Sequence, residues 1–295
     1  FPEAWATTRG AGVTIAVIDS GVDPTHPDLR ANLLPLIDEV AATGQRDSMG
    51  GDDYTGRDSV GHGTHVAGLI AAVRGNGLGV SGGAPEAKIL PVKVTPSDGF
   101  SDDATIAKGI ADAIAGGARV LNLSIGGPEP SPLLLEALND ALRADAVPVI
   151  ASGNHGGDTY YPAAYEGMVS VGALTETGVV AAYSAGGRGL VLVAPGGALA
   201  ADRQGERLTS TVPTYPAFTA DVQRLAPGYG ALAGTSMAAP LVSAAAALVL
   251  ATSPGLAPAQ VRTRLAATAR DGGATGWDGD FGYGTLDAAA AVGAL

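Results

Sequence analysis

The chain has 295 residues, 46% of them apolar, a formal net charge of −12 and no cysteine. Its length and apolar content suffice for one large core, so we predict a single α/β domain over residues 1–295. The lack of cysteine excludes disulfides, thiolate metal sites and cysteine catalysis. The negative charge argues against nucleic-acid or anionic-membrane partners, because both require a basic surface. No run approaches eighteen unbroken apolar residues, the length expected of a membrane-spanning segment.

Short apolar runs rich in β-branched residues recur along the chain and predict strands. They cover residues 13–18, 89–94, 119–123, 147–151, 168–173 and 190–194. Helical spacing predicts helices capped by Ser101, over 132–144, from Ser236, over 258–269 and from about Leu286. Strands that are apolar throughout and alternate with helices are typical of a parallel sheet covered on both faces. We therefore expect a three-layer α/β fold with a mostly parallel central sheet and helices on both faces.

Ser236 lies in the string Gly234-Thr235-Ser236-Met237-Ala238-Ala239-Pro240, directly before an Ala-rich apolar run. Small neighbours and a helix that begins at the serine would hold its hydroxyl at a helix N-terminus. Unpaired backbone N–H groups and a partial positive charge at that position stabilise an oxyanion, as a nucleophile requires. The ordinary alternative is that Ser236 is only the N-cap of the helix.

Three further residues have the chemistry that a nucleophilic serine needs. His62 stands between Gly61 and Gly63, and Asp19 ends the first predicted strand. Asn154 follows the strand at 147–151. Asp19 and Asn154 would thus lie at the carboxyl edge of a parallel sheet, where ligands bind in open α/β folds. Taken singly, each has an ordinary reading as a structural histidine, a turn-capping carboxylate or a turn asparagine.

The ordered set resembles the four active-site signatures of the subtilisin-like serine proteases. The matching segments are 19–21, 61–68, 152–154 and 234–240, and the resemblance extends from about Trp5 to 282–284. It implies a subtilisin-like fold and a serine endopeptidase in which Ser236 attacks, His62 is the base and Asp19 orients the imidazole. Asn154 and the Ser236 backbone N–H would bind the oxyanion. Because His62 must be neutral to act, we expect activity to fall with acid around the unperturbed histidine pKa of about 6.5.

The same resemblance implies a substrate groove. Ser124, Ile125 and Gly126 match the edge strand that pairs with the substrate backbone, with an ordinary strand end as the alternative. Gly153 belongs to the same groove. Tyr160 stands where many relatives carry a small residue, so it either narrows the first pocket or points to solvent.

The segment 73–80 resembles the high-affinity calcium loop of this family. Asp28, Asn76 and the carbonyls of Leu78 and Val80 would supply the hard oxygen ligands that calcium prefers. One usual ligand has no counterpart, because the chain starts after the N-terminal segment that provides it.

The sequence predicts a secreted or cell-surface endopeptidase of broad specificity. It would act as a monomer on polypeptides, and the chain would be its mature form, with a propeptide assisting folding and none visible here. The alternative within enzymes is a selective maturation protease that cleaves a precursor or leader peptide, suggested by Tyr160 and an apparent insertion at 214–227. The alternative from another class is a catalytically silent peptide-binding protein on the same fold.

Overall fold

The computed structural model describes residues 1–42, 56–97, 99–199, 207–217 and 226–293. All six predicted strands are confirmed, within two residues at their ends, and they lie in one parallel sheet of seven strands in the order β2-β3-β1-β4-β5-β6-β7. Its strands are β1 (Thr14–Asp19), β2 (Ile37–Asp38), β3 (Lys88–Lys93), β4 (Val120–Leu123), β5 (Val147–Ala151), β6 (Val169–Leu174) and β7 (Leu192–Pro195).

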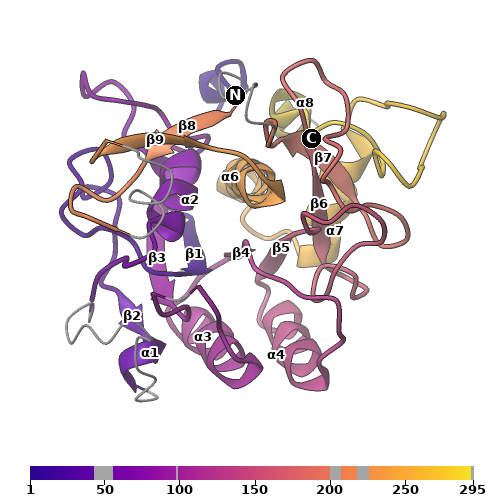
Figure 1. Ribbon diagram of the computed structural model, residues 1–295. Coiled ribbons are helices and arrows are strands. Elements are labelled where there is room, and N and C mark those ends of the chain that lie inside the picture. Colours follow the sequence, from indigo (N-terminus) through magenta and orange to yellow (C-terminus); the bar gives the residue numbers. More distant parts are fainter. Residues whose placement is uncertain (43–55, 98, 200–206, 218–225, 294–295) are drawn as a thin grey trace.

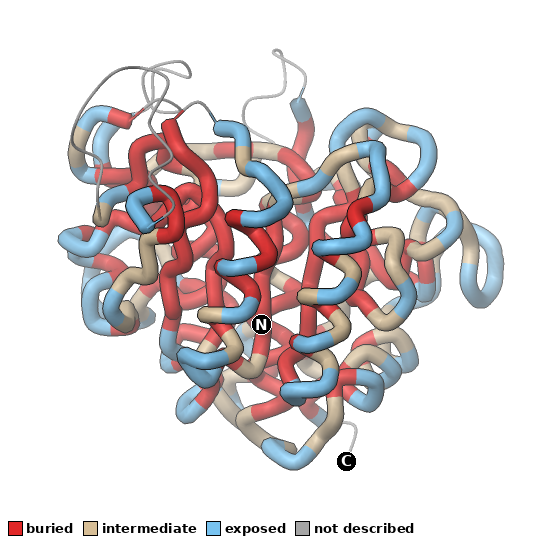
Figure 2. The backbone as a smooth tube through the Cα atoms, turned by 90° about the horizontal axis from the view of Figure 1, so that it is seen from below, coloured by how far each residue is buried: buried red, intermediate tan, exposed pale blue. Residues whose placement is uncertain are grey.

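Helices cover both faces of this sheet, as predicted (Figure 1). The described helices are η1 (Ala4–Ala6), α1 (Glu39–Ala42), α2 (His62–Ala71), α3 (Asp103–Ala115), α4 (Pro132–Arg143), α6 (Thr235–Thr252), α7 (Pro258–Ala267) and α8 (Ala288–Gly293). Ile15 and Val17 of β1 face the core shared with α2, α6, α7 and α8, whereas Ala16 and Ile18 face the core shared with α3 and α4. Figure 2 shows the buried strands beneath helices whose outer sides are exposed.

The sequence-based prediction missed the short helices η1 and α1 and three strands. Strand β2 has only two residues, which is too short for a periodic signal. The antiparallel hairpin of β8 (Leu208–Thr211) and β9 (Tyr229–Leu232) contains few large apolar residues and is partly exposed. It packs on α2, and the carbonyls of Thr64 and His65 in that helix accept hydrogen bonds from the Thr211 and Ser210 hydroxyls. Short polar strands of this kind are defined by tertiary contacts rather than by hydrophobic pattern.

The predicted cap of α3 was wrong by one residue. Asp102, not Ser101, is the N-cap, because its carboxylate accepts the backbone N–H of Thr105 at 2.8 Å. The Ser101 hydroxyl instead donates to the carbonyl of Val94 at 2.7 Å and tethers the loop to the end of β3. A carboxylate at this position also complements the positive end of the helix.

The central helix α6 is apolar along its whole length. Its 18 residues would suffice by length and hydropathy to cross a membrane, but 83% of them are buried inside the protein. It contacts strands β4 to β7 and helix α2, so its apolar surface is used in the core.

The sheet topology determines where polar side chains gather. Strands β1, β4 and β5 are neighbours and run parallel. Asp19 ends β1, Ser124 follows β4, and Ser152 follows β5. These residues therefore lie at one edge of the sheet, the carboxyl edge, in adjacent positions.

Candidate active site

Asp19 and His62 form a hydrogen-bonded pair at this edge. The imidazole Nδ1 lies 2.9 and 3.0 Å from the two carboxylate oxygens of Asp19. The Asp19 side chain is 2% exposed, whereas that of His62 is 26% exposed. A carboxylate accepts and does not donate, so Nδ1 carries the proton and Nε2 of the neutral ring is left as a base.

The surroundings of His62 shift its pKa. Burial lowers the pKa of the imidazole, but the charge of Asp19, the hydrogen bond to Asp19 and the charge of Asp58 outweigh this and raise it above 6.5. The expectation of an unperturbed value therefore needs correction, because the sequence does not show how closely two carboxylates face the ring.

This shift predicts the acid limb of the pH profile. Only the neutral ring of His62 can accept a proton, and a raised pKa means that the ring is protonated at higher pH than a free imidazole. We therefore expect kcat/KM for a peptide to fall with decreasing pH around a midpoint above 6.5. Initial rates at low substrate concentration between pH 4 and 9 measure it. A midpoint at or below 6.5 would contradict this assignment.

Ser236 lies in the first turn of α6, one residue later than the sequence suggested. The helix begins at Thr235 with Gly234 as its N-cap, so the reading of Ser236 as the N-cap is wrong. Gly234 has a φ of 151°, where a side chain would be strained. Ser236 is half-buried, and its hydroxyl donates to the carbonyl of Ser124 at 3.3 Å.

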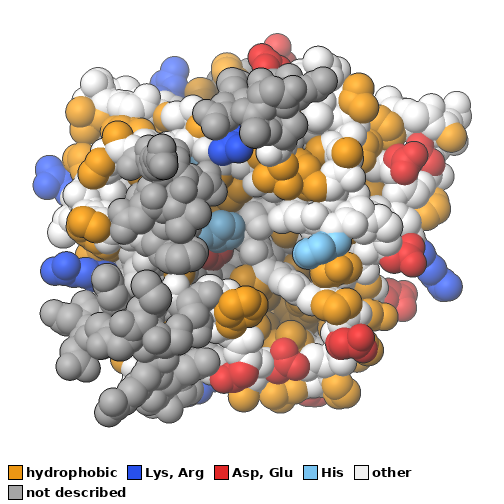
Figure 3. Space-filling view, viewed as in Figure 1, with side chains coloured by type: hydrophobic (Ala, Val, Ile, Leu, Met, Phe, Trp, Pro, Cys, Tyr) orange, Lys and Arg blue, Asp and Glu red, His pale blue; other side chains and the backbone are white. Residues whose placement is uncertain are grey.

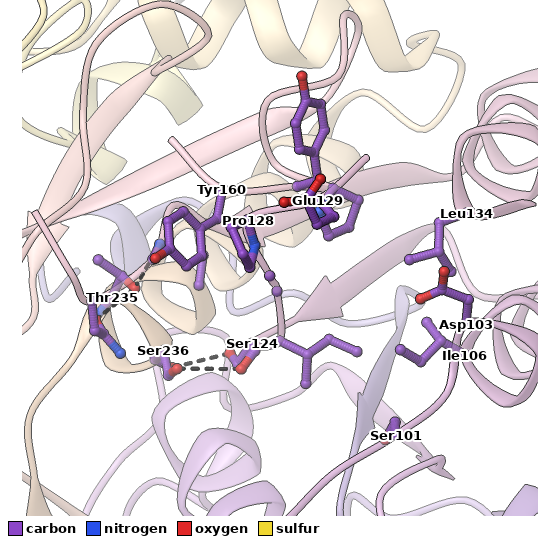
Figure 4. A pocket seen from close by; sticks show the side chains of 18 of the residues that line it. Ser101, Asp103, Ile106, Ser124, Pro128, Glu129, Leu134, Tyr160, Thr235 and Ser236 are labelled. Carbon is purple, nitrogen blue, oxygen red and sulfur yellow. Dashed lines mark hydrogen bonds between the residues drawn. The ribbon is translucent and has the colours of Figure 1, made fainter. Parts of the chain in front are cut away.

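Pro240 explains a second bond between these segments. In a regular helix the N–H of residue 240 would donate to the carbonyl of Ser236, but proline has no N–H. That carbonyl instead accepts the Ser124 hydroxyl at 3.1 Å. The proline thus frees an acceptor that fastens the first turn of α6 to the end of β4 (Figure 4).

Asn154 is fixed in orientation by Thr235. Its side-chain oxygen accepts the Thr235 backbone N–H at 2.8 Å and the Thr235 hydroxyl at 2.9 Å. Because both groups are donors, they identify the oxygen of the amide and leave its NH₂ group on the other side. A donor is thereby available beside the residue that precedes Ser236.

Asn154, Thr235 and Ser236 line a pocket of about 530 Å³ at the carboxyl edge of the sheet. Ser236, Asn154 and Gly153 lie at one end, and Ser124, Ile125 and Gly126 continue along it. At its other end the apolar side chains of Ile106 and Leu134 lie beside the carboxylate of Asp103 (Figure 4). Figure 3 shows the hollow on this face of the molecule, bordered by histidine and hydrophobic side chains.

Tyr160 is half-buried and lines this pocket. A Cβ on Gly153 would lie 3.1 Å from Cγ of Tyr160, so the ring packs directly on the glycine. The other side of Tyr160 carries the ring of His155, stacked at 5.2 Å between centroids and 12° between planes. The sequence left open whether Tyr160 reaches the pocket, and the structure places it in the wall.

The candidate calcium ligands are brought together only in part. Asn76 and Val80 lie beside the buried Asp28, whose two oxygens accept the Asn76 amide at 2.6 Å and the Val80 N–H at 3.1 Å. The Leu78 N–H bonds to Asn76, not to Asp28. Oxygens that already hold protein donors would have to release them to an ion, and calcium takes six to eight oxygens. Within the described residues no group of three or more acidic or histidine side chains could hold a metal.

Sequence reasoning missed two polar residues of the site. Thr235 orients Asn154, and Asp58 is a fully buried carboxylate four residues before His62. A carboxylate shortly before a helix start is a capping signal, and this pattern could have drawn attention to Asp58. The apparent insertion at 214–227 lies partly outside the described residues, since 218–225 are not described.

Comparison with known proteins identifies the family of this chain. The family model described as "Subtilase family" matches residues 10–284. The chain belongs to the subtilase family. Over 96% of its length it is 38% identical to subtilisin BL from Lederbergia lenta, of which it covers 91%. It is 37% identical to fervidolysin from Fervidobacterium pennivorans, and there it spans 42% of the relative's length.

Solved structures give the same result. A protease from Pseudoalteromonas arctica superposes with a TM-score of 0.87 at 35% identity, covering 99% of this chain and 93% of the other. A lanthipeptide protease superposes with a TM-score of 0.81 at 28% identity, covering 99% and 90%. The subtilisin-like fold is thereby confirmed, and the chain is a serine endopeptidase that hydrolyses peptide bonds.

Proposed function

We propose that this subtilase hydrolyses peptide bonds through an acyl-enzyme formed on Ser236, with His62 as the base and Asp19 as its orienting partner. The observation that carries this proposal is the bond from Nδ1 of His62 to Asp19 at 2.9 Å, which fixes the tautomer with a basic Nε2. The helices α2 and α6, which begin at His62 and Thr235, pack against each other. Their first turns meet the same edge of the sheet through Asp19 and Asn154.

The chemical steps follow from these positions. The Ser236 hydroxyl turns from the Ser124 carbonyl towards His62 and loses its proton to Nε2 as the oxygen attacks the substrate carbonyl. His62 then donates that proton to the leaving amine, and water reverses the sequence to release the acid. Asn154 and the Ser236 backbone N–H are the donors to the oxyanion, at the positive end of α6.

The substrate is a polypeptide in extended conformation. The segment Ser124 to Gly126 leaves β4 at the pocket and offers backbone groups to a strand laid beside it. Backbone pairing does not select side chains, so it supports broad specificity. Gly153 has no side chain, and Tyr160 packs on it as one wall of the pocket next to the reacting bond.

A selective role in peptide maturation is the second candidate. It is favoured by the similarity to a lanthipeptide protease and by the bulk of Tyr160 in the pocket wall. Peptides that vary only in the residue before the cleaved bond distinguish the two functions. Cleavage across small and large residues supports the broad enzyme, and cleavage of a single type supports the selective one.

Tyr160 should limit the size of that residue. We expect Tyr160→Ala to raise kcat/KM for a phenylalanine peptide about ten-fold relative to the matching alanine peptide, because about one ring of space is opened. His155→Ala is the control, since it removes the outer ring of the stack and leaves Tyr160 on Gly153. An unchanged ratio in the Tyr160 variant would show that another residue closes the pocket.

We also propose a structural calcium ion bound by Asp28, the Asn76 amide oxygen and the carbonyls of Leu78 and Val80. It is supported by the buried carboxylate of Asp28 beside Asn76. We expect EGTA to lower the Tm of the calcium-loaded protein by about 5 °C, as removal of an ion held at 100 times its Kd would do. Asp28→Asn should abolish the response. A Tm that EGTA leaves unchanged contradicts the site.

We propose that residues 1–295 form one catalytic domain, which works outside the cell as a monomer and folds with the help of a propeptide. The acidic surface suits solubility rather than nucleic-acid or membrane binding.

A further inference from the structure

Asp58 is a carboxylate that the proposed reaction does not use. It is 0% exposed and lies in the turn between Gly56 and the start of α2. Burying a charged group is costly unless it is fully hydrogen-bonded. Burial raises the pKa of Asp58, while bonds from Thr64, Gly61 and Ser20 act in the opposite direction. Because the Asp58 carboxylate is costly to bury, the hydrogen bonds that it accepts indicate which parts of the structure it holds in place.

One of its tasks is to hold the first turn of α2. The N-cap residue, Gly61, has no side chain to bond the free N–H groups there. Asp58 replaces that cap: Oδ1 accepts the Gly61 N–H at 2.7 Å and Oδ2 accepts the Thr64 N–H and hydroxyl at 2.8 and 2.6 Å. His62 is the first residue of this helix, so its backbone lies between the two bonded positions.

The other task is to connect this turn to Asp19. The Ser20 hydroxyl donates to Oδ1 of Asp58 at 2.8 Å and accepts the Gly63 N–H at 3.0 Å. Ser20 follows Asp19 directly, and its own N–H bonds to the Asp19 carboxylate at 2.7 Å. One hydroxyl thus joins the segment that carries the orienting acid to the segment that carries the base.

Further groups close the cluster. The buried Lys93 ammonium donates to the Ser20 carbonyl at 2.9 Å and to the Ser59 hydroxyl at 3.2 Å. The Asp58 backbone N–H donates to the Tyr215 hydroxyl at 3.0 Å. The ionisable groups around the His62 ring and Asp58 are Asp19, Lys93, Tyr215 and the buried His65, and Arg57 and Asp23 lie beside Tyr215.

We propose that Asp58 is a positioning residue for catalysis, which sets the imidazole of His62 against Asp19 by capping α2 and by bonding Ser20. This inference rests on the proposed role of His62. The fixed geometry holds Nδ1 on Asp19 and leaves Nε2 free to act as the base, without contact between Asp58 and the substrate. Small displacements of a catalytic base cost large factors in rate, so such a clamp has a kinetic effect.

Asp58→Asn tests the proposal. An amide has one acceptor and one NH₂ group, so either orientation leaves a backbone N–H of Gly61 or Thr64 without a partner. We expect kcat at pH 9 to fall about ten-fold with KM within about two-fold. The loss of a negative charge should also lower the His62 midpoint by about 0.5 unit. Asp23→Asn is the control, because Asp23 is also 0% exposed and, among the described residues, its carboxylate accepts bonds from Thr25 and Thr214 and none from Ser20 or the first turn of α2.

Histidine-ring NMR separates this inference from the proposed function. In a Ser236→Ala background, which carries only four histidines, the His62 titration is read without any turnover. A lower midpoint in Asp58→Asn and also in Ser20→Ala, which keeps the charge of Asp58, with no change in Asp23→Asn, supports the clamp even if the chain hydrolyses nothing. If Asp58→Asn does not fold, Ser20→Ala keeps Asp58 and removes the hydroxyl that bonds Asp58, the Asp19 carboxylate and the Gly63 N–H, and kcat should fall about three-fold. An unchanged His62 titration together with an unchanged kcat overturns the proposal and leaves Asp58 as a cap for stability alone.

Discussion

Replacing Ser236 by alanine is expected to lower kcat for peptide hydrolysis by about six orders of magnitude. The figure is that of subtilisin, a member of the same family, in which loss of the serine alone costs about as much as loss of all three catalytic groups. The physical reason is that the serine nucleophile is absent, so attack by Ser236 is replaced by attack of water, helped only by the oxyanion donors and by substrate binding. Rates with a chromogenic peptide at pH 9 measure the loss.

Ser243→Ala is the matched control for this substitution. Ser243 lies on the same helix, is fully buried, does not line the pocket and donates to Asn122 at 2.8 Å, so it reaches the pocket residue Ser124 only through the Asn122 amide. Its loss should leave kcat within a few-fold while lowering stability by about 1 kcal/mol. A Ser236→Ala protein that retains a tenth of the wild-type rate would exclude Ser236 as the nucleophile.

Replacing Asn154 by alanine is expected to lower kcat by about 100- to 1,000-fold with little change in KM. The range is again taken from the corresponding asparagine of subtilisin. The amide would donate to an oxygen that becomes negatively charged only in the transition state, so the loss falls on kcat rather than on ground-state binding. Because Thr235 orients the amide from behind, Thr235→Val should cause a smaller loss of about ten-fold.

The comparison of these two variants tests orientation as well as chemistry. Equal losses of kcat in Asn154→Ala and Thr235→Val would mean that the Thr235→Val substitution disturbs more than the orientation of the Asn154 amide. A loss below about five-fold in Asn154→Ala would remove its side chain from the oxyanion site and leave the backbone N–H groups of α6 in that role.

Much of the fold was predictable because its signal is local. The six strands predicted from sequence are buried on both faces, so each is a short apolar run with polar or glycine-rich ends. The hairpin of β8 and β9 gives no such signal, since Thr209, Ser210 and Thr211 of β8 are polar and the strand depends on α2 for burial. The offset of one residue at Ser101 and at Ser236 has the same origin, because capping is decided by geometry that several polar residues could satisfy.

The site was predictable to the extent that it is carried by motifs. Asp19, His62 and Asn154 stand in short segments whose glycines mark close contacts, and the structure joins Asp19 to His62 and directs Asn154 towards the start of α6. The supporting residues were not predictable in this way. The bonds from Ser20 to Asp58 and from Thr235 to Asn154 join side chains from distant segments, which no local pattern in one sequence displays. The raised pKa of His62 also depends on contacts in the folded structure. Burial lowers this pKa, but the charges of Asp19 and Asp58 outweigh burial and raise it.

Covalent labelling by a fluorophosphonate tests the central claim most directly, namely that Ser236 is a nucleophile activated by His62. The protein should be labelled stoichiometrically, and peptide mass mapping should place the adduct on Ser236, with labelling lost in Ser236→Ala and lost with acid around the His62 midpoint. Failure of the intact protein to label, or an adduct on another serine, would contradict the account and favour a silent peptide-binding protein on this fold.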